Sequence, residues 1–168
     1  MTTKPVAQPH RVRFVPMTEQ NFDRYIESAV PSYARDQIEA GNWSSESALE
    51  RAKAVFARLL PKGLNTEGQS LNTIVDTSSD EAVGHIWYAA ANHEDRQFVA
   101  LYDFLIYPTF RKRGYGQAAL AELDGEAKRL GLPSVMLHVF GHNKQARALY
   151  RKLGYVETDV TMAKRLVP

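Results

Sequence analysis

The chain has 168 residues, which is enough for one sizeable hydrophobic core and too few for two ordinary domains. It contains no cysteine, which excludes a disulfide framework, a thiolate nucleophile and a cysteine-based metal site. The formal net charge of +2 does not indicate nucleic-acid binding, and no apolar run approaches the roughly 20 residues that span a bilayer. We therefore expect a cytoplasmic monomer or homodimer that binds neither nucleic acid nor membranes.

The first half of the chain predicts a strand, three helices and two further strands. Residues 1–9 contain no apolar signal-peptide core and are expected to form a flexible tail, which leaves residues 10–168 as a single domain. Thr18 is placed to cap a helix that Pro31 should interrupt. The expected strands cover residues 11–15, 71–75 and 82–89, and the remaining helices cover residues 33–40 and 48–59.

The second half alternates between strands and helices. Residues 97–107 are almost unbroken apolar, which predicts a central strand covered on both faces. A helix with one apolar face is expected after this strand, and Gly131 is expected to end it. A strand, a helix and a return strand are then expected over residues 135–140, 144–153 and 157–166. This order predicts an α/β fold with a mixed, mostly antiparallel central sheet flanked by helices.

The most informative segment joins the strand at 97–107 to the helix that follows. Arg111, Lys112 and Arg113 stand before Gly114 and Gly116 at the start of that helix. The free N–H groups of a first helical turn, together with the helix dipole, favour a bound anion. Glycine lets the anion approach closely because it has no Cβ. The segment therefore predicts a phosphate-binding turn.

Other interpretations of this turn remain open. Gly114-x-Gly116-x-x-Ala119 matches the dinucleotide-binding fingerprint, but the strand at 135–140 carries no acidic residue to hold a ribose. A P-loop would need Lys-Ser or Lys-Thr after the second glycine, where Gln117 and Ala118 stand. The segment can also be an ordinary basic turn.

A longer pattern around this turn fits a third kind of phosphate-binding motif. The run Ile106-x-Pro108-x-Phe110-Arg111-x-x-Gly114-x-Gly116 resembles the acetyl-CoA-binding motif of the GNAT superfamily of N-acetyltransferases. The resemblance extends downstream through Asn143, Tyr150 and Leu153-Gly154-Tyr155, and it covers about residues 99–155. It implies a GNAT fold and acetyl transfer from acetyl-CoA to a small-molecule or peptide amine, by direct attack in a ternary complex.

The resemblance also implies which residues contact acetyl-CoA. In that family this strand separates from its neighbour, so its free backbone groups can pair with the pantetheine arm and the acetyl carbonyl. Asn143 either caps the helix at 144–153 or contacts the pantetheine arm, and the two roles are compatible. The pyrophosphate would be held by backbone amides in the turn. The implied contacts are Phe104, Leu105, Ile106, Arg111, Lys112, Arg113, Gly114, Tyr115, Gly116, Gln117, Asn143 and Tyr150.

Three residues are candidates for catalysis. Tyr150 lies on an apolar helix stripe, so it is either a core aromatic or, as the resemblance implies, the acid that protonates the leaving thiolate. His138 stands where peptide N-terminal acetyltransferases of this superfamily have a glutamate base, and its ordinary pKa near 6.5 suits that role. Asp103, the one charge between residues 98 and 107, can attract a cationic amine or hold a neighbouring loop. His85, His93 and Glu94 are weaker candidates, at strand edges or in an exposed loop.

Metal binding is not expected, and a second function stays open. The sequence has no H-x-x-x-H or H-E-x-x-H spacing, so we predict no metal. A non-catalytic acyl-CoA sensor or interaction module would keep the phosphate-binding turn. Such a module would need neither Tyr150 nor a base.

Overall fold

One open sheet forms the centre of the protein. The computed structural model describes residues 11–164 and 166, so the tail expected at residues 1–9 lies outside the described residues. The first four strands pair antiparallel and the last two pair parallel, in the spatial order β1-β2-β3-β4-β5. The α/β fold with a mixed, mostly antiparallel sheet is therefore confirmed. The strands are β1 (Val12–Pro16), β2 (Gln69–Asp76), β3 (Ala82–His93), β4 (Arg96–Ile106) and β5 (Val135–Leu137).

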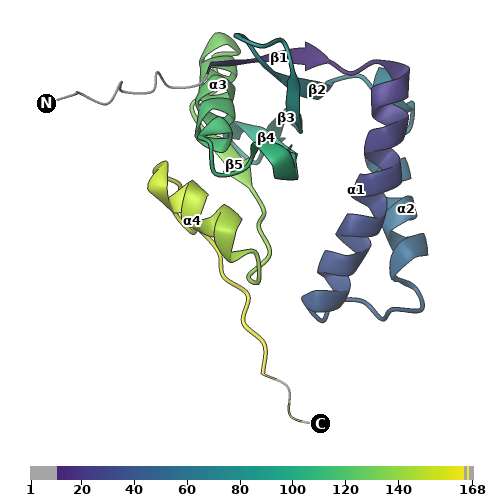
Figure 1. Ribbon diagram of the computed structural model, residues 1–168. Coiled ribbons are helices and arrows are strands. Elements are labelled where there is room, and N and C mark those ends of the chain that lie inside the picture. Colours follow the sequence, from purple (N-terminus) through teal and green to yellow (C-terminus); the bar gives the residue numbers. More distant parts are fainter. Residues whose placement is uncertain (1–10, 165, 167–168) are drawn as a thin grey trace, which may run out of the picture.

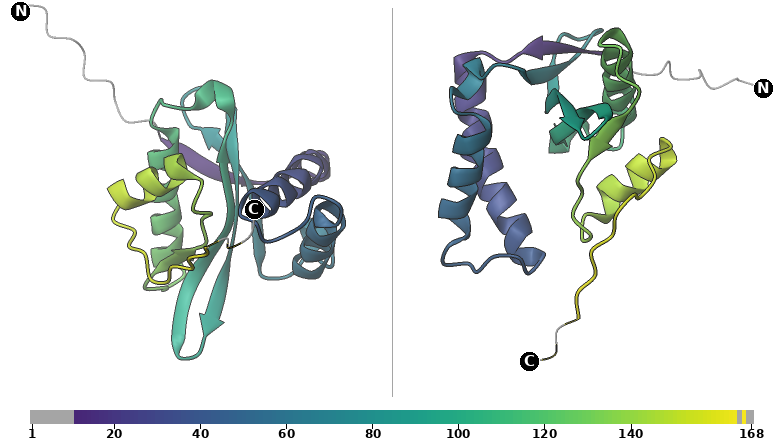
Figure 2. Two further views of the ribbon diagram at one scale, coloured as in Figure 1. Left: turned by 90° about the horizontal axis from the view of Figure 1, so that it is seen from below. Right: turned by 180° about the vertical axis from the view of Figure 1, so that it is seen from behind.

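Helices cover both faces of this sheet. Figures 1 and 2 show α1 and α2 together on one side, and α3 and α4 on the other. No helix of the described chain combines the length and the apolar character that crossing a membrane requires. The α-helices are α1 (Glu19–Glu39), α2 (Ala48–Leu59), α3 (Tyr115–Arg129) and α4 (Lys144–Lys152), with short 3₁₀ turns η1 (Gly63–Asn65) and η2 (Pro108–Phe110).

Helix α1 continues through Pro31, so the predicted interruption is wrong. Proline lacks the backbone N–H and crowds the preceding turn, which usually breaks or kinks a helix. Here Val30 and Ala34, on either side of the proline, are buried in a cluster with Ala48 and Ala52 of α2. This packing stabilises the helix on both sides of the proline.

Two predicted strands differ from the structure. β5 ends at Leu137, so His138 and the two residues after it lie in the loop to α4. The return strand is absent, because residues 157–164 and 166 form no strand and make no pairing with the sheet. In Figure 1 this segment leaves the end of α4 as an extended chain.

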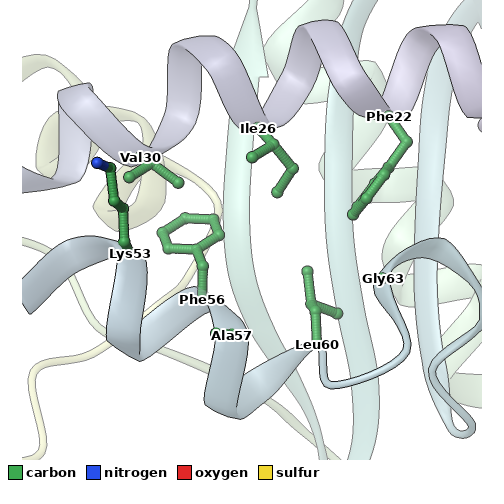
Figure 3. A pocket seen from close by; sticks show the side chains of 8 residues that line it. All are labelled: Phe22, Ile26, Val30, Lys53, Phe56, Ala57, Leu60 and Gly63. Carbon is green, nitrogen blue, oxygen red and sulfur yellow. The ribbon is translucent and has the colours of Figure 1, made fainter. Parts of the chain in front are cut away.

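A shallow apolar groove lies between α1 and α2 (Figure 3). Phe22, Ile26 and Val30 of α1 face Phe56 and Leu60 of α2 across it. The residues that line this groove include none of the site residues predicted from the sequence. The groove therefore belongs to the packing of the helix pair, and the predicted site lies elsewhere.

Candidate functional site

A β-bulge divides β4 into two halves. Trp87 of β3 pairs with Asp103, whereas the next residue, Tyr88, pairs with Leu101, so Tyr102 is an extra residue on β4. A bulge bends the strand and re-aims the side chains that follow it. The expectation that β4 is covered on both faces fails at this point, because Tyr102 is 43% exposed.

The second half of β4 has no neighbouring strand on its outer side within the described residues. β5 pairs with β4 only as far as Leu101. The N–H of Tyr107 donates to a β3 carbonyl at 2.9 Å. Because backbone groups alternate along a strand, Leu105 also faces β3, while Phe104 and Ile106 face the open side. We call this side of Phe104–Ile106 the open edge of β4.

Phe104 and Ile106 direct two N–H and two C=O groups to the open edge, and two of these four groups have partners within the chain. The Phe104 N–H donates to Oδ1 of the adjacent Asp103 at 2.8 Å. The Ile106 carbonyl accepts from Nε of Arg111 at 2.9 Å. An extended ligand that carries amide groups can pair with such an edge as an added strand does.

The basic turn leads from this edge into α3. Arg111, Lys112 and Arg113 are all exposed, so three cations surround the start of the helix. Lys112 has φ +59° and Gly114, the N-cap residue, has φ +92°, a conformation that favours glycine. No side chain caps the first turn of α3. Its N–H groups can therefore meet an anion, as predicted for phosphate.

Gly116 has a packing role as well. A Cβ at this position would lie 3.0 Å from Cδ2 of Leu149 in α4 and 3.9 Å from the ring of Phe104. The absence of a side chain thus allows α3 and α4 to approach each other beside the open edge. The sequence analysis attributed both glycines to the close approach of a phosphate. In the structure, Gly114 is needed for its positive φ and Gly116 for the space that Leu149 occupies.

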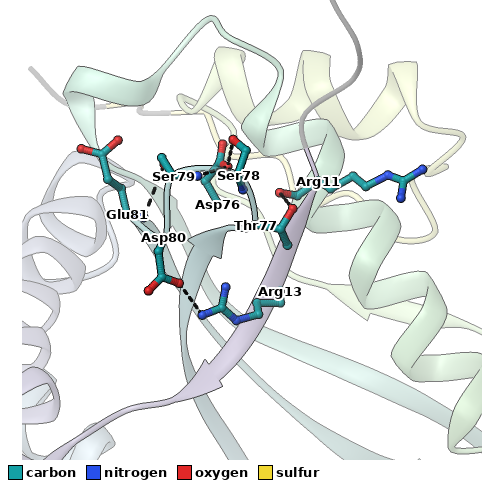
Figure 4. Close-up of polar contacts among 8 residues, drawn as sticks. All are labelled: Arg11, Arg13, Asp76, Thr77, Ser78, Ser79, Asp80 and Glu81. Atoms are coloured by element: carbon teal, nitrogen blue, oxygen red, sulfur yellow. Dashed lines mark hydrogen bonds and ion pairs between the residues drawn. The ribbon is translucent and has the colours of Figure 1, made fainter.

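Tyr115 fixes the start of α3 to the sheet. Its side chain is buried, and its hydroxyl donates to Oδ2 of Asp76 at 2.6 Å. In the β2–β3 turn, Asp76 also accepts from the hydroxyl and the N–H of Ser78, and a salt bridge joins Asp80 to Arg13 (Figure 4). These donors hold the pKa of Asp76 well below its usual range. The hydrogen bond to Asp76 and burial raise the pKa of Tyr115 to about 12.

Asp103 is held from three directions. Its Oδ2 accepts from the Tyr25 hydroxyl at 2.9 Å and lies 3.5 Å from Nε2 of His85, while Oδ1 accepts the Phe104 N–H. Tyr25 and His85 are buried, but the side chain of Asp103 is 34% exposed. Burial, followed by the charge of Asp103, raises the pKa of Tyr25. Two buried groups therefore orient a carboxylate that remains accessible beside the open edge.

His85 and Tyr25 are the residues that the sequence argument undervalued. His85 is not at an exposed strand edge, because it is 6% exposed and its ring lies edge-on to Tyr25 at 4.8 Å. The available signal was a lone histidine within the apolar run at 82–89. The Tyr25 hydroxyl gave no local signal, because its partner lies 78 positions away.

Tyr150 lies on α4 and packs against the main core. Burial is the main cause that raises its pKa above the ordinary value of a tyrosine, and the charges of Tyr155 and Asp103 add to the effect. Leu149, the residue before Tyr150, and Phe104 both lie within 4 Å of the Cβ position of Gly116, so this part of α4 lies beside the open edge. The phenol stays protonated at neutral pH.

Asn143 and His138 lie in or beside the loop between β5 and α4. Oδ1 of Asn143 accepts from the Ala146 N–H at 3.1 Å, so this residue caps α4. His138 is exposed, and its ring lies edge-on to Phe140 at 5.1 Å. The described contacts of His138 include neither Asp103 nor Tyr150.

The same loop also contacts the C-terminal end of α1. Nε2 of His142 lies 3.0 Å from Oδ1 of Asp36 and 3.6 Å from Oε2 of Glu39. One ligand atom from each residue falls within 4.8 Å of the others, a spacing that a metal ion can use. Local spacing rules could not find this group, because His142 is 106 positions from Asp36.

The sequence model described as Acetyltransferase (GNAT) family matches residues 34–155. The chain belongs to the GNAT family of acetyltransferases. The N-acetyltransferase YycN of Bacillus subtilis, which is named as uncharacterized, is 38% identical over 155 residues, 92% of this chain and 99% of YycN. YdgE of the same organism, named in the same way, is 33% identical over 151 residues, 89% of this chain and 95% of YdgE.

Solved structures agree with the GNAT assignment. The crystal structure of YycN has a TM-score of 0.87 and covers 94% of this chain and 99% of its own. An acetyltransferase from Pyrococcus furiosus, at 20% identity and a TM-score of 0.63, shares the fold; the match covers 94% of this chain and 99% of that protein. The family and fold predicted from the sequence are confirmed. GNAT proteins transfer acetyl groups and generally use acetyl-CoA.

Proposed function

We propose that this GNAT protein transfers an acetyl group from acetyl-CoA to a primary amine by direct attack in a ternary complex. The observation that carries the proposal is the open edge of β4, which begins beside the carboxylate of Asp103 and lies, through Phe104 and Leu149, next to helix α4. The amine belongs to a small molecule or a peptide. The basic turn adjoins the same edge, through the bond from Arg111 to Ile106.

The residues present fit acetyl-CoA. The backbone of Phe104 and Ile106 would pair with the pantetheine arm, while Leu105, whose backbone faces β3, would contribute through its partly exposed side chain. Amides from Lys112 to Gln117 would hold the pyrophosphate at the uncapped start of α3, and Asn143 would contact the pantetheine arm. When bound, acetyl-CoA supplies an activated acyl carbon with a thiolate leaving group.

Asp103 receives the acceptor. A lysine-like amine has a pKa near 10.4, so presenting it neutral at pH 7 costs about 4.6 kcal/mol. Asp103 attracts the cationic amine and accepts one of its protons, while Tyr25 and His85 hold the carboxylate in place. The second proton leaves the nitrogen for solvent as the amide forms. We assign this role to Asp103 instead of His138, because His138 is exposed and has no described contact with this cluster.

Tyr150 stabilises the leaving group. As the new N–C bond forms and the C–S bond breaks, the Tyr150 hydroxyl donates a hydrogen bond to the departing sulfur. Its raised pKa makes full proton transfer to a thiolate, whose thiol has a pKa near 8.5, uphill. The hydroxyl therefore acts mainly as a hydrogen-bond donor, and solvent completes the protonation of the thiolate.

Mass spectrometry of reaction products tests this proposal. The protein is incubated with acetyl-CoA and four acceptor classes: a peptide α-amine, a lysine peptide, a polyamine and an aminoglycoside. The proposal expects an N-acetylated product from at least one class, and much less product with Asp103→Asn. Tight acetyl-CoA binding with no acetylated product from any class would contradict it.

A further inference from the structure

Three side chains from two distant parts of the sequence meet at the C-terminal end of α1. Asp36 and Glu39 stand in the last turn of this helix, and His142 lies in the loop between β5 and α4. Nε2 of His142 is 3.0 Å from Oδ1 of Asp36 and 3.6 Å from Oε2 of Glu39. We call these three residues the α1–loop cluster. It shares no residue with the open edge of β4 or with the basic turn.

The spacing within the α1–loop cluster suits ligands around a small metal ion. Ligand atoms bound at about 2.0–2.1 Å to a tetrahedral zinc ion lie about 3.3 Å apart. The two distances from the His142 nitrogen lie on either side of this value. Asp36 and Glu39 are three positions apart on one helix, so they project from the same face. Small side-chain movements therefore suffice to bring all three residues onto one ion.

A hydrogen bond from His142 accounts for only one of the two carboxylates. The ring N–H can donate to Asp36 at 3.0 Å, but the 3.6 Å separation from Glu39 is too long for a hydrogen bond. A protonated ring would still attract Glu39, yet an ion pair with a side chain that is 65% exposed contributes little to stability. An ion between the three atoms would use a lone pair from each of them.

The end of α1 is also electrostatically suited to a cation. The C-terminal end of a helix carries a partial negative charge from its unpaired carbonyl groups. Basic side chains often balance this charge, but the last turn of α1 contains none and has Asp36 and Glu39 instead. Two carboxylates at this end of a helix are unfavourable by themselves. A divalent cation bound between them offsets both their charge and that of the helix end.

Aromatic packing orients the ring of His142. This ring stacks on Phe140, with ring centres 5.4 Å apart and planes inclined by 18°. Phe140 in turn lies 6.2 Å from the ring of Tyr33, which belongs to α1. The Asn143 N–H donates to the Phe140 carbonyl at 3.0 Å and closes the turn that contains His142. Because its side chain is 24% exposed, His142 is held in place and still reachable by an ion from solvent.

We propose that the α1–loop cluster binds one zinc ion, with Nε2 of His142 and one carboxylate oxygen from each of Asp36 and Glu39 as ligands. Imidazole is a typical ligand of zinc, whereas magnesium and calcium prefer sets made of oxygen atoms alone. Water completes the tetrahedron on the exposed side. This proposal replaces the sequence-based expectation of no metal, which rested on local spacing.

The zinc ion clamps two parts of the fold together. Helix α1 carries Tyr25, whose hydroxyl orients Asp103, and the loop ends at Asn143, the N-cap residue of α4. Asp36 and His142 are 106 positions apart, so a shared ion closes a long stretch of chain. We therefore expect zinc to order the end of α1 and the loop at the same time.

Calorimetric titration of the untagged protein with zinc at neutral pH tests the site. One ion should bind per chain, and His142→Ala should weaken binding by at least about 10-fold, since even outer-shell partners of a metal contribute that much. The matched control is His93→Ala, which removes an exposed histidine at the end of β3 and should bind as the wild type does. Glu39→Gln should also weaken binding, whereas the exposed Glu27→Gln on the same helix should not. Binding only at millimolar zinc, or equal effects within either pair, would overturn the proposal.

Two further measurements test the ligands and the clamp. Cobalt(II), used in place of zinc, should give the visible bands of a tetrahedral site in the wild type and lose them in His142→Ala, whose fold circular dichroism checks. Zinc should slow amide hydrogen exchange in the last turn of α1 and in residues 138–143 together, and leave the β3–β4 turn unchanged. Cobalt bands that persist in the variant, or protection of only one of the two elements, would contradict a zinc ion shared between them.

Discussion

The hydroxyl of Tyr25 on α1 donates a 2.9 Å hydrogen bond to the carboxylate of Asp103 on β4. This bond joins the N-terminal helix to the strand that carries the open edge, directly after the bulge. His85 lies 3.5 Å from the same carboxylate oxygen. Two buried side chains from other elements therefore orient the carboxylate that we propose as the receiver of the amine.

Asp103→Asn should lower kcat/KM for cationic amines by about 10²-fold, because it removes the charge that attracts the acceptor and the group that takes its proton. Acetyl-CoA affinity, measured by calorimetry, should change little. Asp95→Asn, in the exposed β3–β4 turn, is the matched control and should behave as the wild type. Equal kinetics for the two variants would remove Asp103 from the site.

Tyr150→Phe should reduce kcat by about 10²-fold while acetyl-CoA binding is kept, because only a hydrogen bond to the departing sulfur is lost. The raised pKa of Tyr150 means that this loss persists across neutral pH. The measurement is a rate of thiol release under conditions in which chemistry limits turnover. Wild-type turnover in this variant would leave Tyr150 as a packing residue.

Two alanine substitutions in α3 should have opposite effects on stability. Gly116→Ala places a Cβ 3.0 Å from Leu149 and should lower the free energy of unfolding by about 1–3 kcal/mol. Gly125→Ala meets only an ordinary 3.6 Å contact with Arg129 and should raise it by about 0.5–1 kcal/mol. Adding Leu149→Ala should reduce the cost of Gly116→Ala, as measured by a double-mutant cycle in urea. Independence of the two sites would disprove the packing role.

The bond between Tyr115 and Asp76 predicts a stability that falls at both ends of the pH range. The folded-state pKa of Asp76 is lowered, so its contribution is complete above the unfolded pKa near 3.9 and is lost as pH falls below it. The pKa of Tyr115 is raised to about 12, so its contribution is complete below pH 10 and is lost as pH rises toward 12.

Chemical denaturation across this pH range checks the prediction. Asp76→Asn should weaken both dependences, whereas Asp80→Asn, on the exposed part of the same turn, should keep them. If the acid dependence of Asp76→Asn equals that of the wild type, the carboxylate of Asp76 is not responsible.

The sequence predicted what depends on local patterns. The order of strands and helices follows from apolar periodicity, and the basic turn at 111–116 combines cations, glycines and a helix start within a few positions. The predicted break at Pro31 was wrong because the packing of α1 on α2 keeps the helix continuous there. The contact between Tyr25 and Asp103 spans 78 positions and follows only from the folded chain. The return strand expected over residues 157–166 was wrong, because apolar alternation does not show whether a neighbouring strand is available for pairing.

The rate of thiol release, measured while acetyl-CoA and an accepted amine are varied together, tests the central claim most directly. Direct attack in a ternary complex predicts that release requires the amine and that double-reciprocal plots intersect. Acetyl-CoA binding without amine-dependent release would contradict the account and favour a non-catalytic acyl-CoA sensor.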